Sequence, residues 1–316
     1  MNRRSVIGNI FQKHAILLPL ATLFLIFSII TPKFIDSDNL INILRQISVL
    51  SIISIGSTYV IISGGIDLSV GSIMALVGVF VVNMAKAHAG FLWMILIALA
   101  FGLIIGFING IFIMNFTIPP FIVTLATMTV GRGVVLLLTK GSNVTEINNE
   151  AFLFFGRGYI AGIPFPVIVM IPLYIIGAVC LTRSIYGRQI FAVGNNEKAS
   201  LISGINVKTI KLSVYMIAGF TAAIGAIIST SRMNTVTPMF GSGIEFDCIT
   251  AVVLGGTVIT GGKGSLLNTL FGAALLGIIS NGFNLIGISS YWAQIAKGII
   301  LISAIMVYNI NIKNKQ

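Results

Sequence analysis

Charged residues are scarce in this chain of 316 residues: they make up 9% of it, whereas hydrophobic residues make up 56%. An ordinary soluble domain carries about 25% charged residues, so this composition excludes a typical globular protein. No polar stretch is long enough to form a soluble domain, the longest candidates being 140–162 and 183–211. We therefore expect residues 1–316 to form a single domain embedded in a membrane.

Cysteine and histidine are nearly missing as well, with two of each. Cys180 and Cys248 lie inside apolar runs, where cysteine behaves as a small buried hydrophobe rather than as half of a disulfide. His14 and His88 lie at the ends of apolar runs, without the spacing of metal ligands. Since no G-x-S-x-G or H-E-x-x-H motif occurs either, we expect no catalytic residues, no metal and no cofactor. These absences speak against an intramembrane enzyme.

A phosphate-binding loop is also lacking, although Gly262-Lys263 superficially resembles the end of one. The G-x-x-x-x-G-K-[ST] pattern needs glycine where this chain has Thr257, and serine or threonine where it has Gly264. The chain is therefore not expected to bind ATP itself.

Long apolar runs are abundant instead. The hydrocarbon core of a bilayer is about 30 Å thick and needs about 20 apolar residues per helix. The sequence contains ten runs near that length, at 15–31, 47–63, 71–86, 91–111, 121–139, 163–182, 211–230, 246–260, 265–282 and 290–309. The predicted fold is all-α, a polytopic bundle of about ten transmembrane helices.

The basic residues predict the orientation of this bundle. The net charge is +11, but lysine and arginine lie at the ends of the runs and form no patch with interleaved aromatics, which argues against nucleic-acid binding. Ten crossings place both termini on one side of the membrane. Eleven basic residues fall on that side and six on the other, namely Lys33, Arg45, Lys86, Lys140, Arg157 and Arg232. Both termini, including the short segment 1–14, and the loop 183–211 are therefore predicted to be cytoplasmic.

Two glycine-rich stretches, 64–72 and 255–265, predict breaks in the helices. Backbone groups freed by a break inside a membrane need partners from protein or water. Asp67, in the first stretch, either lines a pathway or caps the next helix by accepting N–H bonds from residues 69–71. Arg132 lies in the middle of the fifth run and needs a buried partner, for which Asp67 and a backbone carbonyl at a helix break are the candidates.

Small residues recur every four positions within two runs, at Gly102, Gly106 and Gly110 and again at Ala218 with Ala222. This spacing lets helix backbones approach closely, which is a main packing device in membranes. We expect these residues to hold the bundle together rather than to contact a substrate.

The loop 183–211 contains a predicted short amphipathic helix over 195–202, which Gly204 stops. Its mixture of charged and apolar residues allows two interpretations. The helix either lies on the lipid surface or docks onto another protein.

Several motifs spread over nearly the whole chain resemble one family. They are 64–72, 119–128 followed by Arg132-Gly133, Gly187-Arg188, 194–197, 203–207, 243–247, 251–257, 261–265, Asn281-Gly282 and Lys297-Gly298. With these motifs the sequence resembles the membrane permease subunits of ATP-binding-cassette sugar importers, in the ribose, xylose, arabinose and galactoside group. Tyr291 and the ending 312–316 are most similar to the ribose-transporting members.

The resemblance implies a transport subunit without chemistry of its own, which translocates a monosaccharide, D-ribose first of all, across the bacterial inner membrane. Its implied partners are separate ATPase subunits that bind ATP, an extracytoplasmic sugar-binding protein and a second permease copy. Open alternatives are a permease for another pentose or hexose or for a furanosyl signal such as autoinducer-2, and a stand-alone carrier or channel. Uptake without ATPase subunits would identify the last of these.

The resemblance also assigns roles to residues. The ATPases are expected to push on the loop around Asn195, Asn196, Glu197, Lys198, Ala199, Ser203 and Gly204, although Glu197-Lys198-Ala199 departs from the Glu-Ala-Ala of many other importers. The substrate path is expected to include Asp67, Ser69, Ser72, Asn109, Thr124, Arg132 and Asn281. The carboxylates of Asp36, Asp38, Glu245 and Asp247 are either contacts for the sugar-binding protein or solvated loop charges.

Overall fold

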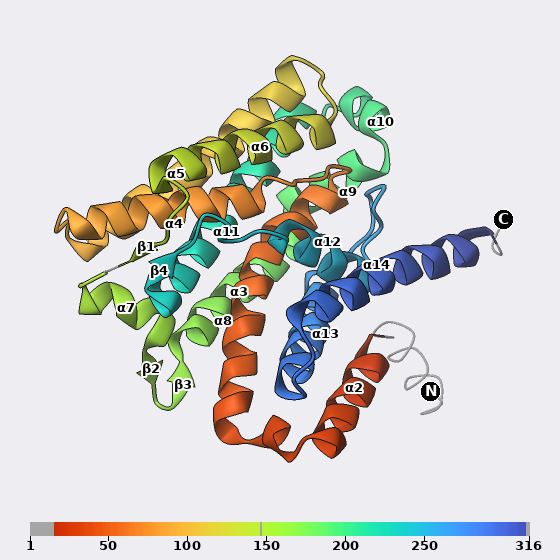
Figure 1. The fold of residues 1–316 in the computed structure, drawn as a ribbon. Coiled ribbons are helices and arrows are strands. Elements are labelled where there is room, and N and C mark those ends of the chain that lie inside the picture. The colour runs from red at the N-terminus through yellow and green to blue at the C-terminus, as the bar shows by residue number, and fades with distance from the viewer. Residues whose placement is uncertain (1–15, 146, 314–316) are drawn as a thin grey trace.

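The computed structural model describes residues 16–145 and 147–313, so the predicted cytoplasmic segment 1–14 lies outside the described residues. The described chain is mostly helical (Figure 1), and each predicted run contains a helix. The helices are α2 (Leu17–Ile30), α3 (Ser37–Ile62), α4 (Val70–Lys86), α5 (Phe91–Asn115), α6 (Pro120–Thr139), α7 (Glu150–Arg157), α8 (Phe165–Arg183), α9 (Ile185–Asn195), α10 (Glu197–Ile202), α11 (Val207–Met233), α12 (Ile244–Leu254), α13 (Leu266–Leu285) and α14 (Ser290–Lys313), with a 3-10 turn η1 (Pro32–Ile35).

Six of these helices are long and apolar enough to cross a membrane, namely α3, α5, α6, α8, α11 and α13. The apolar helices α2 and α4 are shorter, with 14 and 17 residues. The all-α polytopic fold is thus confirmed.

The extent predicted for the run 246–260 is wrong. Helix α12 ends at Leu254 after 11 residues, so it is only about 16 Å long and cannot cross a bilayer alone. Gly256, with φ +79°, turns the chain out of the helix, and an irregular segment continues toward α13.

Helix α11 lies at the centre of the bundle and packs against α3, α4 and α5. Its contact with α5 is very close: a Cβ atom added to Gly102 would lie 2.7 Å from the Cβ of Ala223, and one added to Gly106 would lie 2.9 Å from the Cα of Met216. The packing role predicted for these small residues is therefore confirmed.

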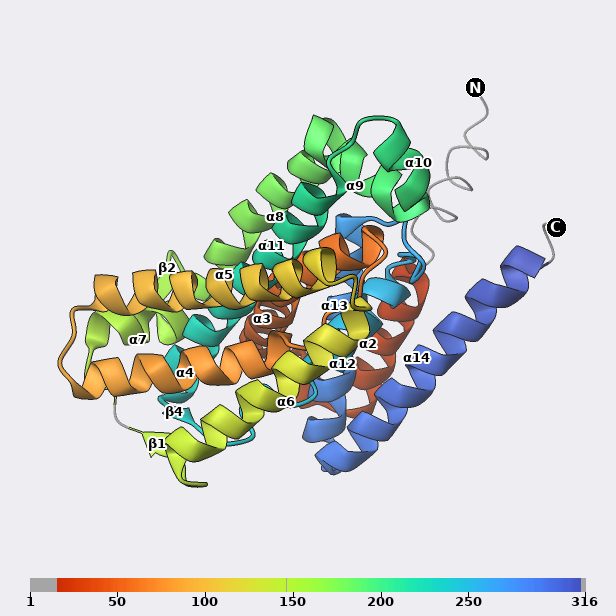
Figure 2. The ribbon, with the colours of Figure 1, turned by 90° about the horizontal axis from the view of Figure 1, so that it is seen from above.

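Short structures cover the two ends of the bundle (Figure 2). At one end, the pair β1 (Val144–Thr145) and β4 (Thr235–Val236) and the pair β2 (Tyr159–Ile160) and β3 (Ile163–Pro164) accompany α7. At the other end, α9 and α10 project from the long helices, and α14 runs toward this side. We call these the α7 end and the α9–α10 end.

Candidate functional site

The first glycine stretch breaks the chain between α3 and α4, as predicted. Gly64 adopts φ +82°, and the chain then runs without helix to Ser69, the residue before α4. Asp67 is 3% exposed, and its Oδ1 accepts hydrogen bonds from the Ser69 N–H at 2.8 Å and from the Ser69 hydroxyl at 2.6 Å. Its Oδ2 has no partner among the described residues. Of the N–H groups of residues 69–71 that a cap would bind, Asp67 accepts only that of Ser69, which precedes the first helical residue, Val70. Asp67 therefore fixes the turn that leads into α4, and whether it lines a pathway stays a prediction.

A chain of polar side chains continues from this break across two neighbouring helices. Asn109 on α5 donates to the Ser69 hydroxyl at 2.9 Å, and Thr127 on α6 donates to the Asn109 side-chain oxygen at 2.6 Å. The hydrogen bonds thus run in one direction, from Thr127 through Asn109 and Ser69 to the Asp67 carboxylate. The Thr124 hydroxyl donates to the Pro120 carbonyl of its own helix at 2.9 Å and lies 3.3 Å from the Ile66 carbonyl, beside Asp67. We call Asp67, Ser69, Asn109, Thr124 and Thr127 the α4 entry network.

Two residues of this neighbourhood, Thr127 and Tyr215, were not among the predicted site residues. Thr127 follows the expected Thr124 by three positions, so the two hydroxyls share a face of α6, and this spacing was the available signal. Tyr215, on α11, donates from its hydroxyl to the Ile66 carbonyl at 3.4 Å. No local pattern in the sequence connects Tyr215 with Ile66, which is 149 residues away.

The remaining expected path residues lie close to the network or apart from it. Ser72 bonds back to the Ser69 carbonyl at 2.8 Å and lies against Gly131 of α6. Arg132 does not pair with Asp67: its Nη1 donates to the Phe240 carbonyl at 2.6 Å, which is the alternative of a backbone carbonyl. Asn281 exchanges two hydrogen bonds with Asn39, of 2.8 and 3.1 Å, away from the network.

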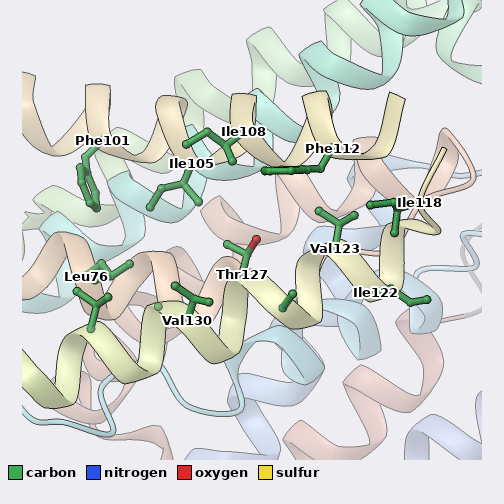
Figure 3. A pocket seen from close by; sticks show the side chains of 13 residues that line it. Leu76, Phe101, Ile105, Ile108, Phe112, Ile118, Ile122, Val123, Thr127 and Val130 are labelled. Carbon is green, nitrogen blue, oxygen red and sulfur yellow. The ribbon is translucent and has the colours of Figure 1, made fainter. Parts of the chain in front are cut away.

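An apolar groove of about 510 Å³ borders the network between α5 and α6 (Figure 3). Thr127 contributes a hydroxyl group to the lining of this groove. The rest of the lining consists of Gly131 and of hydrophobic side chains, among them Ile108, Phe112 and Val130. These three side chains are 41–67% exposed on the outside of the chain. The groove therefore suits lipid or another apolar protein surface better than a free sugar.

At the α9–α10 end, four glycines bring the two broken stretches into contact with α9. The Gly262 N–H donates to the carbonyl of Ile62, the last residue of α3, at 2.9 Å. Cβ atoms added to Gly261 would lie 2.8 Å from the Gly64 nitrogen and 2.8 Å from the Gly194 carbonyl oxygen. We call Gly64, Gly194, Gly261 and Gly262 the glycine junction. No side chain separates the backbones there, so a movement of α9 would reach both breaks directly.

The short helix predicted over 195–202 forms as α10, but it begins at Glu197, because Asn195 ends the additional helix α9 and Asn196 is the N-cap of α10. The Asn196 side chain caps α10 by accepting the Ala199 N–H at 2.9 Å, and Glu197 forms an ion pair of 2.5 Å with Lys211 of α11. Gly204, at φ +81°, ends the segment. Leu201 and Ile202 point outward, 65% and 88% exposed.

Helix α9 is anchored to α11 by a hydrogen bond of 2.7 Å between the hydroxyls of Tyr186 and Ser213. Burial raises the pKa of Tyr186 to about 12, so the phenol stays neutral and keeps its hydrogen atom at physiological pH. The α9–α10 unit is therefore attached to the bundle by this bond, by the Glu197–Lys211 pair and by the glycine junction.

This arrangement combines a polytopic membrane bundle with broken helices, a buried polar network, and a helix, α10, that exposes apolar residues at one end. Such an architecture is that of a transport permease. Comparison with known proteins gives the family. The family described as "Branched-chain amino acid transport system / permease component" matches residues 39–305, and the chain belongs to it. Membership makes the chain a transport component rather than an enzyme.

Named relatives match over nearly the full length. The ribose import permease protein RbsC of Bacillus subtilis (strain 168) is 41% identical over 306 residues, which cover 96% of this chain and 95% of that protein. RbsC of Escherichia coli (strain K12) is 41% identical, covering 93% of this chain and 92% of that protein. The D-allose transport system permease protein AlsC of the same strain is 33% identical, covering 93% and 91%. No solved structure matches the chain.

Proposed function

We propose that this chain is the permease subunit of an ATP-binding-cassette importer that carries D-ribose across the bacterial inner membrane. The observation that carries the proposal is the full-length similarity to ribose import permeases at 41% identity, above the 33% found for the D-allose permease. As one unit over 1–316, the chain would need no cofactor of its own, because ATP would be bound by partner ATPase subunits.

The α9–α10 end is proposed to receive the force from those ATPases. The exposed Leu201 and Ile202 offer apolar contacts to a partner, and the ion pair between Glu197 and Lys211 holds α10 against α11. Displacement of α9 would act on both broken stretches through the glycine junction. The α9–α10 end and both termini are proposed to face the cytoplasm, which is the orientation that the positive-inside rule predicts.

The α4 entry network is proposed to border the sugar path. Its five side chains are fully or largely buried, so in this conformation they lock α4, α5 and α6 together rather than face water. A shift of α6 relative to α5 would release the hydroxyl of Thr127 from Asn109 for a passing sugar. A second copy of this chain is proposed to cover the apolar α5–α6 groove and so complete the path.

The test is reconstitution of the chain in liposomes with candidate ATPase subunits and a sugar-binding protein, followed by uptake of radiolabelled D-ribose. We expect uptake that requires ATP and all components, and weaker competition by unlabelled D-allose and D-xylose than by ribose. Uptake by the permease alone would establish a stand-alone carrier instead. Preferred uptake of another pentose or hexose, or of a furanosyl signal, would replace ribose as the substrate.

A further inference from the structure

Three cavities toward the α7 end converge on one lysine. Cavities of about 470, 240 and 210 Å³ all include Lys297 of α14 in their walls. The largest lies between α12 and α14, and the two smaller ones share Gln46 of α3 and Ser280 of α13. We call these three cavities the Lys297 chamber.

An ion pair stands at the centre of the chamber. Lys297 Nζ lies 2.8 Å from Asp247 Oδ2, and the two side chains are 19% and 24% exposed. Asp247 is therefore not a free loop charge, and the Lys297 ammonium group is directed to Asp247. A pair of this exposure keeps donors and acceptors available to a ligand, because the carboxylate and the ammonium group can each bind further partners.

Amide side chains surround the pair. Gln46, Gln294 and Asn284 line the chamber, and none of them makes a side-chain hydrogen bond to any part of the chain that the structure describes. An amide offers two donors and an acceptor to a ligand. Phe246, 54% exposed, adds an aromatic face to the largest cavity.

Charges in the chamber balance. Lys297 and Arg232 oppose Asp247 and Glu245 across the adjoining cavities. A net charge near zero gives no advantage to an anion such as a sugar phosphate. Neutral polyols, with adjacent hydroxyls for the amides and the ion pair and a C–H face for Phe246, fit this chemistry.

We propose that the Lys297 chamber is a low-affinity binding site for a neutral monosaccharide on its way through the permease. The proposal rests on the proposed function and extends it to a site that lies apart from the α4 entry network. Weak binding is expected because the polar groups approach a ligand from five helices and the ion pair stays partly exposed. A sugar would leave such a site readily.

The first experiment measures occupancy without transport. In the full-length permease with Cys180 and Cys248 replaced by serine, Gln294→Cys is labelled by a membrane-impermeant maleimide in nanodiscs, with and without D-ribose. At about 100 mM ribose, a site with a dissociation constant of about 10 mM is mostly filled, so the labelling rate should fall several-fold. Glycine betaine and ribose 5-phosphate at equal concentration should protect much less.

The matched control is Tyr291→Cys, one turn earlier on α14, where the side chain is 75% exposed and lines none of the three cavities. Ribose should leave its labelling rate unchanged. Equal labelling of the Gln294→Cys variant with and without ribose, or no labelling at all, would overturn the proposal.

The second experiment tests transport in the assembled importer. The double variant Asp247→Asn with Lys297→Gln removes both charges and retains hydrogen-bonding groups of similar shape. We expect the assembled importer to carry at least threefold fewer ribose molecules inward per ATP hydrolysed. Normal uptake would overturn the proposal. If wild-type importer shows no ATP-driven uptake but ribose still protects the chamber, the proposed function fails while the chamber stands.

Discussion

The glycine junction gives the sharpest prediction, because two glycines with nearly equal backbone angles differ in their surroundings. Gly262 has φ +77° and Gly256 has φ +79°, both in the segment between α12 and α13. A Cβ atom added to Gly262 would lie 2.9 Å from the Cα and 3.1 Å from the Cβ of Asn195, whereas one added to Gly256 meets nothing within 4 Å. Gly262→Ala therefore disturbs the contact with α9, and Gly256→Ala serves as its control.

Both variants introduce backbone strain, and only Gly262→Ala also introduces overpacking. Placing alanine in the left-handed region costs about 1–2 kcal/mol in either variant. At Gly262 the neighbouring atoms belong mainly to backbone and cannot rotate away, so overpacking adds about 1–3 kcal/mol. We expect the junction to relieve this strain by separating the end of α9 from the segment that holds Gly262, which would weaken the transmission of force.

The assay compares ribose molecules imported per ATP hydrolysed in proteoliposomes that contain the assembled importer, with thermal unfolding of each permease in detergent. Gly256→Ala should lose some stability and keep the wild-type ratio. Gly262→Ala should lose more stability, and its ratio should fall at least fivefold while ATP hydrolysis continues. Equal import ratios for both variants would refute the view that the junction carries force.

Asp67→Ala removes two hydrogen bonds to Ser69, each worth about 0.5–1.5 kcal/mol, and should reduce ribose uptake more than membrane insertion; equal losses would favour a purely capping role. Gly106→Leu should destabilise the permease by about 3 kcal/mol or more, through overpacking against α11. Gly133→Leu should be tolerated, because a Cβ atom added to Gly133 meets nothing within 4 Å. Gly204→Trp is expected to uncouple ATP hydrolysis from uptake without loss of expression, and normal coupling in that variant would remove this end of α10 from the mechanism.

Helix content and packing were predictable because they depend on local properties of the chain. An apolar run of span length forms a helix in lipid whatever its neighbours are, and the four-residue spacing of Gly102 and Gly106 indicates a close helix contact without identifying the partner. Two patterns gave conflicting predictions for the end of α12, since the apolar run 246–260 extends beyond it whereas the glycine-rich stretch 255–265 predicts a break there. Apolar residues continue past Leu254 to Val258 and Ile259, but the backbone of Gly256 turns the chain away before them.

The site was predictable only where its residues are neighbours in the sequence. Asp67 and Ser69 lie two positions apart, so their hydrogen bonds followed from the motif itself. Asp247 and Lys297 lie 50 residues apart, and each has a plausible explanation alone, as a loop carboxylate and as a lysine that extends to the surface. Only the packing of α12 against α14 shows that they form one ion pair.

The two glycine-rich stretches looked alike in sequence without any evident relation, and their meeting in space gives that likeness a physical reason. Each break leaves backbone groups that need partners inside the membrane protein. The Ile62 carbonyl at the first break accepts the Gly262 N–H of the second, so each break supplies what the other lacks. Because Gly194 of α9 packs against Ile62 and Gly262, a displacement of α9 would act on the hydrogen bond that joins the two breaks. A bundle built in this way can switch at one end as a unit, while the long helices between the breaks stay intact.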